Sequence, residues 1–190
     1  SSEINVGNKD RTTVVDHLTV NNDITIKGNG NLTIFVKDDL SFQAGVKIAH
    51  NNHLPGGITM YYGAENSQLA FNNVKIFGSI YAKDADIVID NDFDIHGALV
   101  TGGQFIDIDT NGNVNEYMIY APNAKTTLTR GKSEVRGTII TKEFSAQGNH
   151  KVSHQPVDFN EIPFFTSNSS ENSNNAVDLI EVEQLVEVGQ

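Results

Sequence analysis

The chain of 190 residues contains no cysteine and no tryptophan, and only four prolines. Without cysteine it has no disulfide scaffold, no thiolate zinc site and no cysteine nucleophile. It also lacks a run of 18 or more apolar residues, so no segment is expected to span a membrane. Basic residues are few, since 13 Lys and Arg stand against 24 Asp and Glu, and the net charge is −11. Binding a phosphate backbone needs Lys and Arg, so nucleic acid is not expected as a partner.

What the chain has in abundance is short alternating apolar segments, such as LTIFV (32–36), ITMYY (58–62) and VKIF (74–77). An apolar period of two predicts β-strands. Asn, Asp and Gly separate these segments, and these residues tolerate the positive φ that tight corners need. Between Thr12 and Ser153 no ten-residue segment has a period of 3.6. The sequence therefore predicts an all-β chain.

The strands repeat at a nearly fixed spacing. SIYA (79–82), ALVT (98–101), MIYA (118–121) and TIIT (138–141) superpose in steps of 19, 20 and 20 residues. Two further apolar segments repeat in the same way. The predicted equivalences are IVI (87–89), IDI (106–108) and TTL (126–128); Ile95, Val114, Val135 and Val152; Ile34, Met60 and Ile80; and, at an offset of 22, Leu18 with Leu40 and Ile24 with Val46.

A fixed period near 20 with three short strands per unit is typical of a solenoid, because one unit cannot bury its apolar side chains alone. A β-sandwich is the alternative, but it gives no reason for equivalent positions to recur once per unit. The predicted fold is an all-β, single-stranded parallel β-helix over residues 1–165, with about seven coils of about 20 residues. At about 4.8 Å per rung, the stack would be roughly 34 Å long.

Several runs resemble an uncharacterised bacterial solenoid domain: GNGNLTIFVKDDLSF, NNVKIFGSIYAKDADIVI and FDIHGALVTGG, with the corner YAPNAK (120–125) and the closing segment VDFNEIP (157–163). The resemblance covers roughly residues 20–165. In such surface proteins the solenoid usually follows a prepilin-like or otherwise membrane-anchored segment, which would then precede Ser1. The resemblance implies a surface or pilus-associated role. Bactofilin-like polymer-forming domains are a more distant relative.

One motif suggests a cation site. In DIDTNGN the residues Asp107, Asp109, Asn111 and Gly112 match positions 1, 3, 5 and 6 of a calcium loop. Ca²⁺ prefers the oxygen ligands that such a loop offers. The glutamate expected at position 12 is replaced by a methionine, and Glu116 comes two residues earlier. The candidate metal residues are therefore Asp107, Asp109, Asn111 and Glu116, and calcium is the one cofactor considered. The alternative is a polar corner whose Asp and Asn bond their own backbone.

An acidic stretch, DADIVIDNDFD (84–94), raises an enzymatic alternative. The repeat predicts that Asp90 stacks near Asp109 on the next coil. Carboxylates one rung apart come close to the separation that retaining glycosidases use. The chain has no tryptophan for a sugar platform, however, and no Lys or Arg within this stretch to tune the acids. The chain is therefore expected not to be an enzyme, and the stretch to be a solvated face or a ladder of carboxylates bridged by cations.

The composition changes after Pro163. TSNSSENSNN (166–175) is poor in apolar residues and predicts a flexible linker. In residues 176–190, Ile180 and Val182 alternate with Glu181 and Glu183, which favours a strand over a helix. Since the end of a β-solenoid is an unpaired edge that must be covered, this segment is predicted to cap the stack or to pair with another molecule.

Together these features predict a non-catalytic structural and adhesive module outside the cell, at the surface of a bacterium or associated with a pilus. Its expected partner is a surface protein or a glycan. The first alternative is a polymer-forming cytoskeletal scaffold that self-associates through its coil ends or its C-terminal strand. The second is a carbohydrate-active β-helix enzyme.

Overall fold

The computed structural model of the protein describes residues 1–51, 57–129 and 132–156. These residues form strands and corners without a helix, and none of them builds a helix of the length and apolarity that a membrane crossing requires. The strands are β1 (Ser2–Gly7), β2 (Arg11–Val20), β3 (Ile24–Gly28), β4 (Leu32–Phe42), β5 (Lys47–His50), β6 (Ile58–Tyr62), β7 (Ser67–Ile76), β8 (Ser79–Ala82), β9 (Ala85–Thr101), β10 (Phe105–Asp109), β11 (Asn113–Leu128), β12 (Glu134–Gly137), β13 (Ile139–Ala146) and β14 (Lys151–His154).

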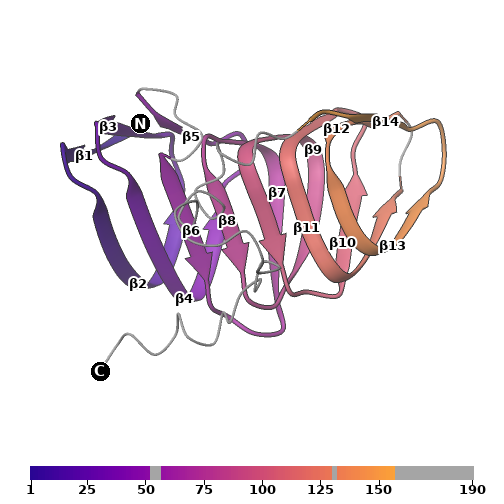
Figure 1. The fold of residues 1–190 in the computed structure, drawn as a ribbon, viewed down its shortest axis with the longest axis horizontal. Coiled ribbons are helices and arrows are strands. Elements are labelled where there is room, and N and C mark those ends of the chain that lie inside the picture. Colours follow the sequence, from indigo (N-terminus) through magenta and orange to yellow (C-terminus); the bar gives the residue numbers. More distant parts are fainter. Residues whose placement is uncertain (52–56, 130–131, 157–190) are drawn as a thin grey trace, which may run out of the picture.

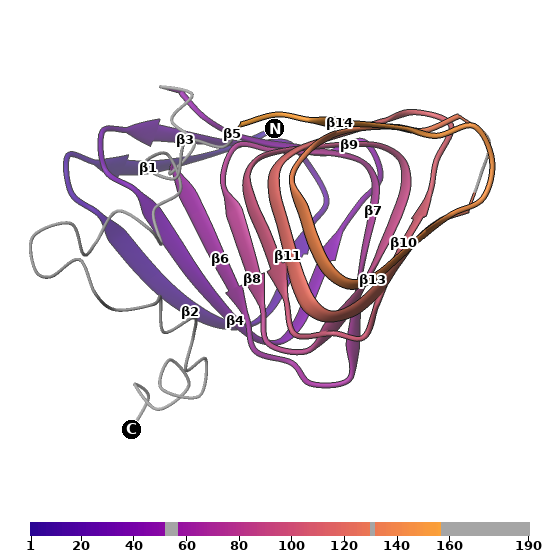
Figure 2. The same ribbon diagram turned by 45° about the vertical axis from the view of Figure 1, so that its right-hand side comes forward.

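The strands wind into a stack of about 7 coils with about 20 residues in each, and every recorded strand pairing is parallel. The prediction of an all-β parallel solenoid is confirmed. Figure 1 shows β2, β4, β6, β8, β11 and β13 side by side along one side of the stack, and Figure 2 shows the three-sided outline of the coils. The coils have three faces. Face 1 is formed by β1, β3, β5, β12, β14 and residues 74–76, 93–95 and 114–116. Face 2 is formed by β6, β8 and residues 11–15, 32–36, 98–101, 118–121 and 139–141. Face 3 is formed by β10 and residues 17–20, 39–42, 67–72, 85–90, 125–128 and 143–146.

The predicted register on face 2 is confirmed. Ile80 pairs with Leu99, Leu99 with Ile119, and Ile119 with Ile139. Upstream, Ile34 and Met60 continue the same column. Because each of these side chains alternates with outward neighbours, the column points into the coil and stacks one residue per rung.

Two predicted equivalences on face 1 are wrong by two residues. Val114 pairs with Phe93 and not with Ile95, and Ile24 pairs with Ile48 and not with Val46. The physical reason is the period of a strand: residues two apart point to the same side, so an apolar pattern fits either register equally well. Only the length of the preceding corner decides between them.

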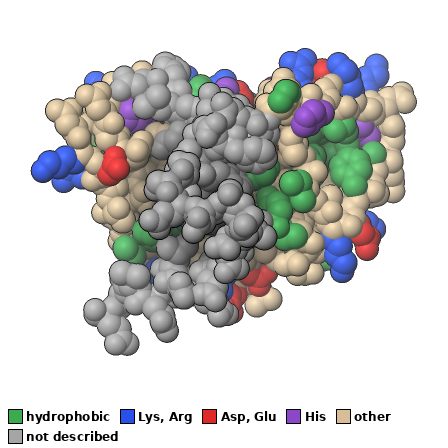
Figure 3. Space-filling view, in the orientation of Figure 1, with side chains coloured by type: hydrophobic (Ala, Val, Ile, Leu, Met, Phe, Trp, Pro, Cys, Tyr) green, Lys and Arg blue, Asp and Glu red, His purple; other side chains and the backbone are tan. Residues whose placement is uncertain are grey.

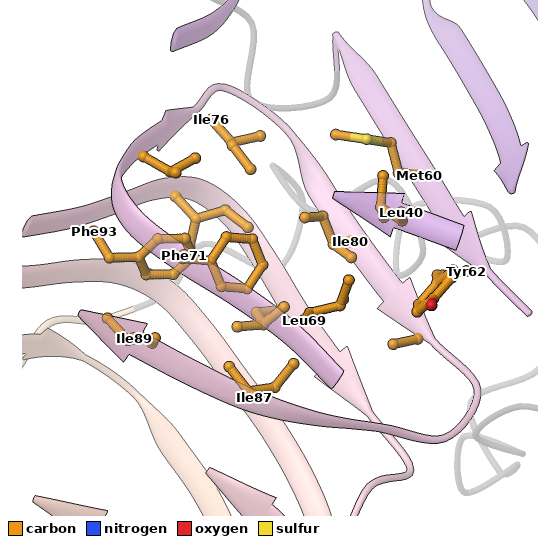
Figure 4. Close-up of a cluster of buried hydrophobic side chains, with 14 of the residues drawn as sticks. Leu40, Met60, Tyr62, Leu69, Phe71, Ile76, Ile80, Ile87, Ile89 and Phe93 are labelled. Carbon is orange, nitrogen blue, oxygen red and sulfur yellow. The ribbon is translucent and has the colours of Figure 1, made fainter. Parts of the chain in front are cut away.

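The core is a set of such inward columns. Face 3 contributes Leu69 and Phe71, and the next rung places Ile87 and Ile89 over them, all with no exposed surface. Figure 4 shows these side chains pointing toward Ile80 from the opposite wall of the coil. Each fully buried side chain of this size contributes about 1.5–3 kcal/mol relative to an exposed one. Stacking of successive coils therefore supplies the stability that a single coil lacks.

Asparagine forms the tight corners, as predicted. Asn66, Asn73 and Asn91 adopt positive φ values of 48°, 53° and 62°. Neighbouring corners also bond to each other, since the Asn91 side-chain amide donates to the Asn72 side-chain oxygen at 2.9 Å. Of the predicted domain organisation, the linker at 166–175 and the strand or cap at 176–190 lie outside the described residues.

Candidate functional site

The residues of DIDTNGN begin in a strand rather than in a loop. Asp107 and Asp109 belong to β10 on face 3, and both are half-buried and point outward. Asp109 pairs with Asp90 on the preceding rung, as predicted. Side chains two residues apart on the same side of an extended strand are about 6.6 Å apart at their bases, whereas a calcium loop curves to bring its ligands together. Asn111 follows at the exposed corner.

The corner after β10 is held by bonds within the protein. The Gly112 amide donates to the Thr110 hydroxyl oxygen at 2.7 Å, and the Asn113 amide donates to an Asp92 carboxylate oxygen at 2.7 Å. The Thr129 hydroxyl donates to a carboxylate oxygen of Asp107 at 3.2 Å. The alternative interpretation of the motif was a polar corner in which its own Asp and Asn side chains bond the backbone. The corner amides are indeed bonded by side chains, but the acceptors are Thr110 and Asp92.

Glu116 lies inside the coil. It pairs with Ile95 on the preceding rung and is 2% exposed, and both of its carboxyl oxygens are buried without a hydrogen-bond partner. Burial raises the pKa of Glu116 to about 9, because a charged carboxylate is poorly solvated there. The structure therefore places Glu116 in the core and Asp107 and Asp109 on the outside, and does not bring the four predicted metal residues together. Within the described ranges, no group of three or more His, Asp and Glu side chains forms a metal-binding set.

Most acidic residues of the 84–94 stretch have structural partners. The backbone amides of Gln104 and Phe105 on the next coil both donate to Asp86, at 2.8 and 2.9 Å. The Asp84 carboxylate likewise accepts the Asn66 amide at 2.9 Å. These contacts satisfy corner donors that the strand ladder leaves open. Asp84 and Asp86 therefore link successive coils, a role that the expected solvated face does not include.

Asp94 on face 1 belongs to a polar cluster with an aromatic side. Burial opposes ionisation of Asp94, but hydrogen bonds from His96 and Lys75 outweigh it and lower the pKa of this carboxyl. The imidazole of His96, 3.0 Å from Asp94, stacks on the Phe77 ring with centroids 4.3 Å apart. The cluster borders a shallow surface groove that also includes Asn73.

Face 2 carries an outward row of apolar and aromatic side chains, here called the outer ladder. The rings of Phe35 and Tyr61 stack with centroids 4.9 Å apart, and those of Tyr61 and Tyr81 with centroids 5.2 Å apart. Figure 3 shows apolar side chains gathered over β11 and β13 on this side of the molecule. From one end of the stack to the other, the outer ladder consists of Val14, Phe35, Tyr61, Tyr81, Val100, Tyr120 and Ile140.

The outer ladder is not among the predicted site residues, although the sequence contains a signal for it. Each repeated segment on face 2 has two adjacent apolar residues, such as Ile80 and Tyr81 or Leu99 and Val100. Adjacent residues of a strand point to opposite sides, so one member of each pair has to face outward.

A model of the family described as "Domain of unknown function (DUF7305)" matches residues 2–117. The chain belongs to this family. No curated protein and no solved structure matches it. The part matched to DUF7305 contains the outer ladder from Val14 to Val100 and ends one residue after Glu116. The last coils, from β12 to β14, lie beyond the match.

Proposed function

We propose that this DUF7305 chain is a non-catalytic structural and adhesive module that acts outside a bacterial cell, at the cell surface or in association with a pilus. The outer ladder is the observation that carries the proposal. A contiguous row of apolar side chains on the outside of a domain commonly marks a surface that binds a partner. Phe35 and Tyr61 offer flat rings at the spacing of the rungs, and tyrosine adds a polar tip to an apolar body.

The rest of the stack supports a spacer role. Inward columns fix one coil on the next, and aspartates such as Asp86 bond corner amides of the following coil. Repetition of one unit along an axis gives a rigid body with long, regular faces, which repeat proteins use for binding. A surface protein or a glycan is the proposed partner. The placement at the cell surface rests on the resemblance of the coil motifs to solenoid domains of bacterial surface proteins.

A second candidate function is a polymer-forming scaffold, favoured by the C-terminal end of the stack. Phe144 and Val152 continue the inward columns of Thr126 and Val135, yet they are 47% and 52% exposed. In a longer stack the next coil would bury these side chains. A second copy placed on this end could bury them in the same way, and repeated contacts of this kind would make a filament. No catalytic role is proposed for Asp90 and Asp109.

Adhesion is tested with the full chain coupled to beads and a panel of purified bacterial polysaccharides and surface proteins. Phe35→Ser combined with Tyr61→Ser is expected to weaken binding about tenfold or more, because aromatic anchors at interfaces commonly contribute over 1 kcal/mol each. The matched control is Thr19→Ala with Ser41→Ala, which removes a 3.3 Å hydroxyl pair from the outside of face 3 and should leave binding unchanged.

Equal binding by both double variants would reject the outer ladder as the adhesive surface. Light scattering after size-exclusion chromatography separates the two candidate functions, since a discrete particle is expected for the adhesive module and filaments for the scaffold. Filaments that disappear in Phe144→Asp, which places a charge on the exposed end, would favour the scaffold.

A further inference from the structure

The groove beside Asp94 on face 1 is a small polar hollow that crosses three rungs. It has a volume of about 240 Å³, which is below the usual range of pockets for drug-sized ligands. Its floor is formed by Val74 and Phe93, and both of these side chains are buried. The side chains around the floor are all polar and come from β7, β9 and β11: Asn73, Lys75, Asp92, Asp94, Asn113 and Asn115. The groove therefore offers hydrogen-bonding groups and charges, but hardly any apolar surface.

The register of the coils arranges these side chains as a grid. Lys75 pairs with Asp94, and Asp94 pairs with Asn115 on the next rung. They lie beside inward residues such as Phe93, so their own side chains point outward. The other three polar side chains lie two residues earlier on the same strands, at the corner. Neighbouring side chains are therefore about 4.8 Å apart along the stack and about 6.6 Å apart along a strand at their bases.

The amides of this groove differ from those of other corners. At an upstream corner the Asn29 side-chain amide donates to the Asn8 side-chain oxygen at 3.1 Å, and the pair is structural. In the groove, no residue of the described ranges bonds the side-chain amides of Asn73, Asn113 or Asn115. Each of these amides has two N–H donors and one oxygen acceptor. All three are therefore open to a ligand.

The charged groups of the groove are held in place by the protein. Lys75 and His96 both bond the Asp94 carboxylate, and Lys75 also lies 5.3 Å from the centroid of the Phe77 ring. One oxygen of Asp92 accepts the backbone amide of the next corner, and no described residue donates to its second oxygen. Groups that are already fixed lose little freedom when a ligand binds.

We propose that this groove binds a neutral saccharide. A sugar hydroxyl both donates and accepts hydrogen bonds, so it can pair with amides and carboxylates alike. The two carboxylates of Asp92 and Asp94 stand against the single ammonium of Lys75, and the chain carries a net charge of −11. Phosphates and uronic acids are therefore repelled. From the first rung to the third the groove extends over roughly 10 Å, which suits about two sugar rings.

The groove would give the adhesive function proposed above, on which its biological role rests, a second contact surface. The outer ladder lies on face 2, whereas the groove lies on face 1 between neighbouring rungs. A glycan chain held on face 1 leaves the outer ladder open to another part of the same partner. Two weak contacts on one rigid body raise the overall affinity when both are engaged together.

Proton–nitrogen NMR spectra of the isotope-labelled full chain test the site, because each side-chain amide gives its own signals. The neutral probes are maltose, cellobiose, lactose and N,N′-diacetylchitobiose, and glucuronate is the anionic probe. The groove variant combines Asn113→Ala with Asn115→Ala. The matched control combines Asn8→Ala with Asn29→Ala, which removes two amides from the upstream corner. Melting curves verify that each variant is folded.

At least one neutral disaccharide is expected to shift the amide signals of Asn73, Asn113 and Asn115 with a Kd of about 1–10 mM, since a small polar ligand in an open groove makes few contacts. The groove variant should weaken this binding about tenfold or more, because two hydrogen-bonding side chains are lost, and the control should leave it unchanged.

Three results would overturn the proposal: no shift of the groove amides with any neutral disaccharide at about 50 mM, tighter binding of glucuronate, or equal losses in the groove variant and the control. The Phe35→Ser and Tyr61→Ser double variant should bind the disaccharide like the native chain. Failure of the groove is therefore distinct from failure of the outer ladder as the adhesive surface.

Discussion

At one inward position of face 1, the upstream coils of the stack carry apolar residues and the downstream coils do not. Upstream, the position holds Ile48, Ile76 and Ile95 on successive rungs, and each is at most 1% exposed. Their side chains stack directly on one another and add to the main core. This half of the stack has the interior that a solenoid needs, with apolar contact from rung to rung.

Downstream, the same position holds Glu116, then Gly137 and then His154. The buried Glu116 carboxyl fills the space in which a side chain at residue 137 would begin. Gly137 also has a φ of +147°, where a residue with a Cβ is strained. The parallel ladder therefore continues after the apolar interior has been interrupted. The downstream coils are expected to be the less stable half.

The largest loss of stability is expected from a substitution on face 2, where the apolar interior continues through both halves of the stack. Ile119 has no exposed surface and stacks between Leu99 and Ile139. Ile119→Asp should lower the free energy of unfolding by about 4 kcal/mol or more, because it buries a carboxylate without a partner. Urea denaturation measures the change. Lys125→Asp on the exposed surface of the same strand should change it by no more than about 0.5 kcal/mol, and equal losses in the two variants would contradict the register.

The second largest change in stability is an increase, and it comes from replacing the buried glutamate that distinguishes the downstream coils from the upstream ones. Glu116→Ile restores the upstream residue type and should raise the free energy of unfolding at pH 7 by about 3 kcal/mol, the energy of holding a carboxyl protonated 2.5 pH units above the usual pKa of 4.5. The folded chain binds one proton more than the unfolded chain between pH 4.5 and about 9. Stability from this group is therefore largest below pH 4.5 and is lost progressively as the pH rises to 9.

Glu116→Gln separates this titration from the rest of the protein. The variant keeps the shape of the side chain and has no proton to release, so its free energy of unfolding should decline less between pH 5.5 and 8.5 than that of the native chain. The lowered pKa of Asp94 affects stability only at acid pH, below this window. Parallel pH profiles for the two proteins would contradict the burial of a neutral Glu116.

The sequence was sufficient for the fold because one apolar pair per coil repeats at a steady spacing. Ile80, Leu99 and Ile119 were placed correctly on that basis. Face 1 was harder, since Phe93 and Ile95 both point inward and the spacing alone does not choose between them. Corner lengths decide the register there, and bends of one to three polar residues leave no periodic signal.

The candidate site was less predictable for a related reason. Glu116 was a candidate calcium ligand because it follows the DIDTNGN motif, yet it lies two residues after the inward Val114 and so shares its side of the strand. Alternation could have placed it in the core. Its burial without a partner, in contrast, depends on Ile95 and Gly137 from neighbouring coils, and no local pattern reports those contacts.

A smaller effect is expected at the corner where the upstream interior gives way to the downstream one. The Asp92 carboxylate accepts the Asn113 amide of the next coil at 2.7 Å. Asp92→Ala should cost about 1–2 kcal/mol, because it leaves that amide without its charged acceptor. Asp38→Ala removes an exposed carboxylate elsewhere and should cost less than about 0.5 kcal/mol. Urea denaturation of both variants measures the difference, and equal costs would mean that the Asp92 contact does not hold the corner.

The smallest effect concerns calcium at Asp107, Asp109 and Asn111. A site of the extracellular type, with a Kd of about 10⁻⁴–10⁻³ M, would raise the free energy of unfolding by about 0.4–1.4 kcal/mol in 1 mM calcium. Thr129 already donates to Asp107, and the outward carboxylates lie along a strand, so an effect at the lower end is expected. Melting curves in calcium and in chelator measure it. Asp107→Ala should abolish the shift and Asp38→Ala, which changes the net charge equally, should preserve it. An unchanged melting temperature of the native chain in 10 mM calcium would make DIDTNGN a structural corner, held by Thr110 and Asp92.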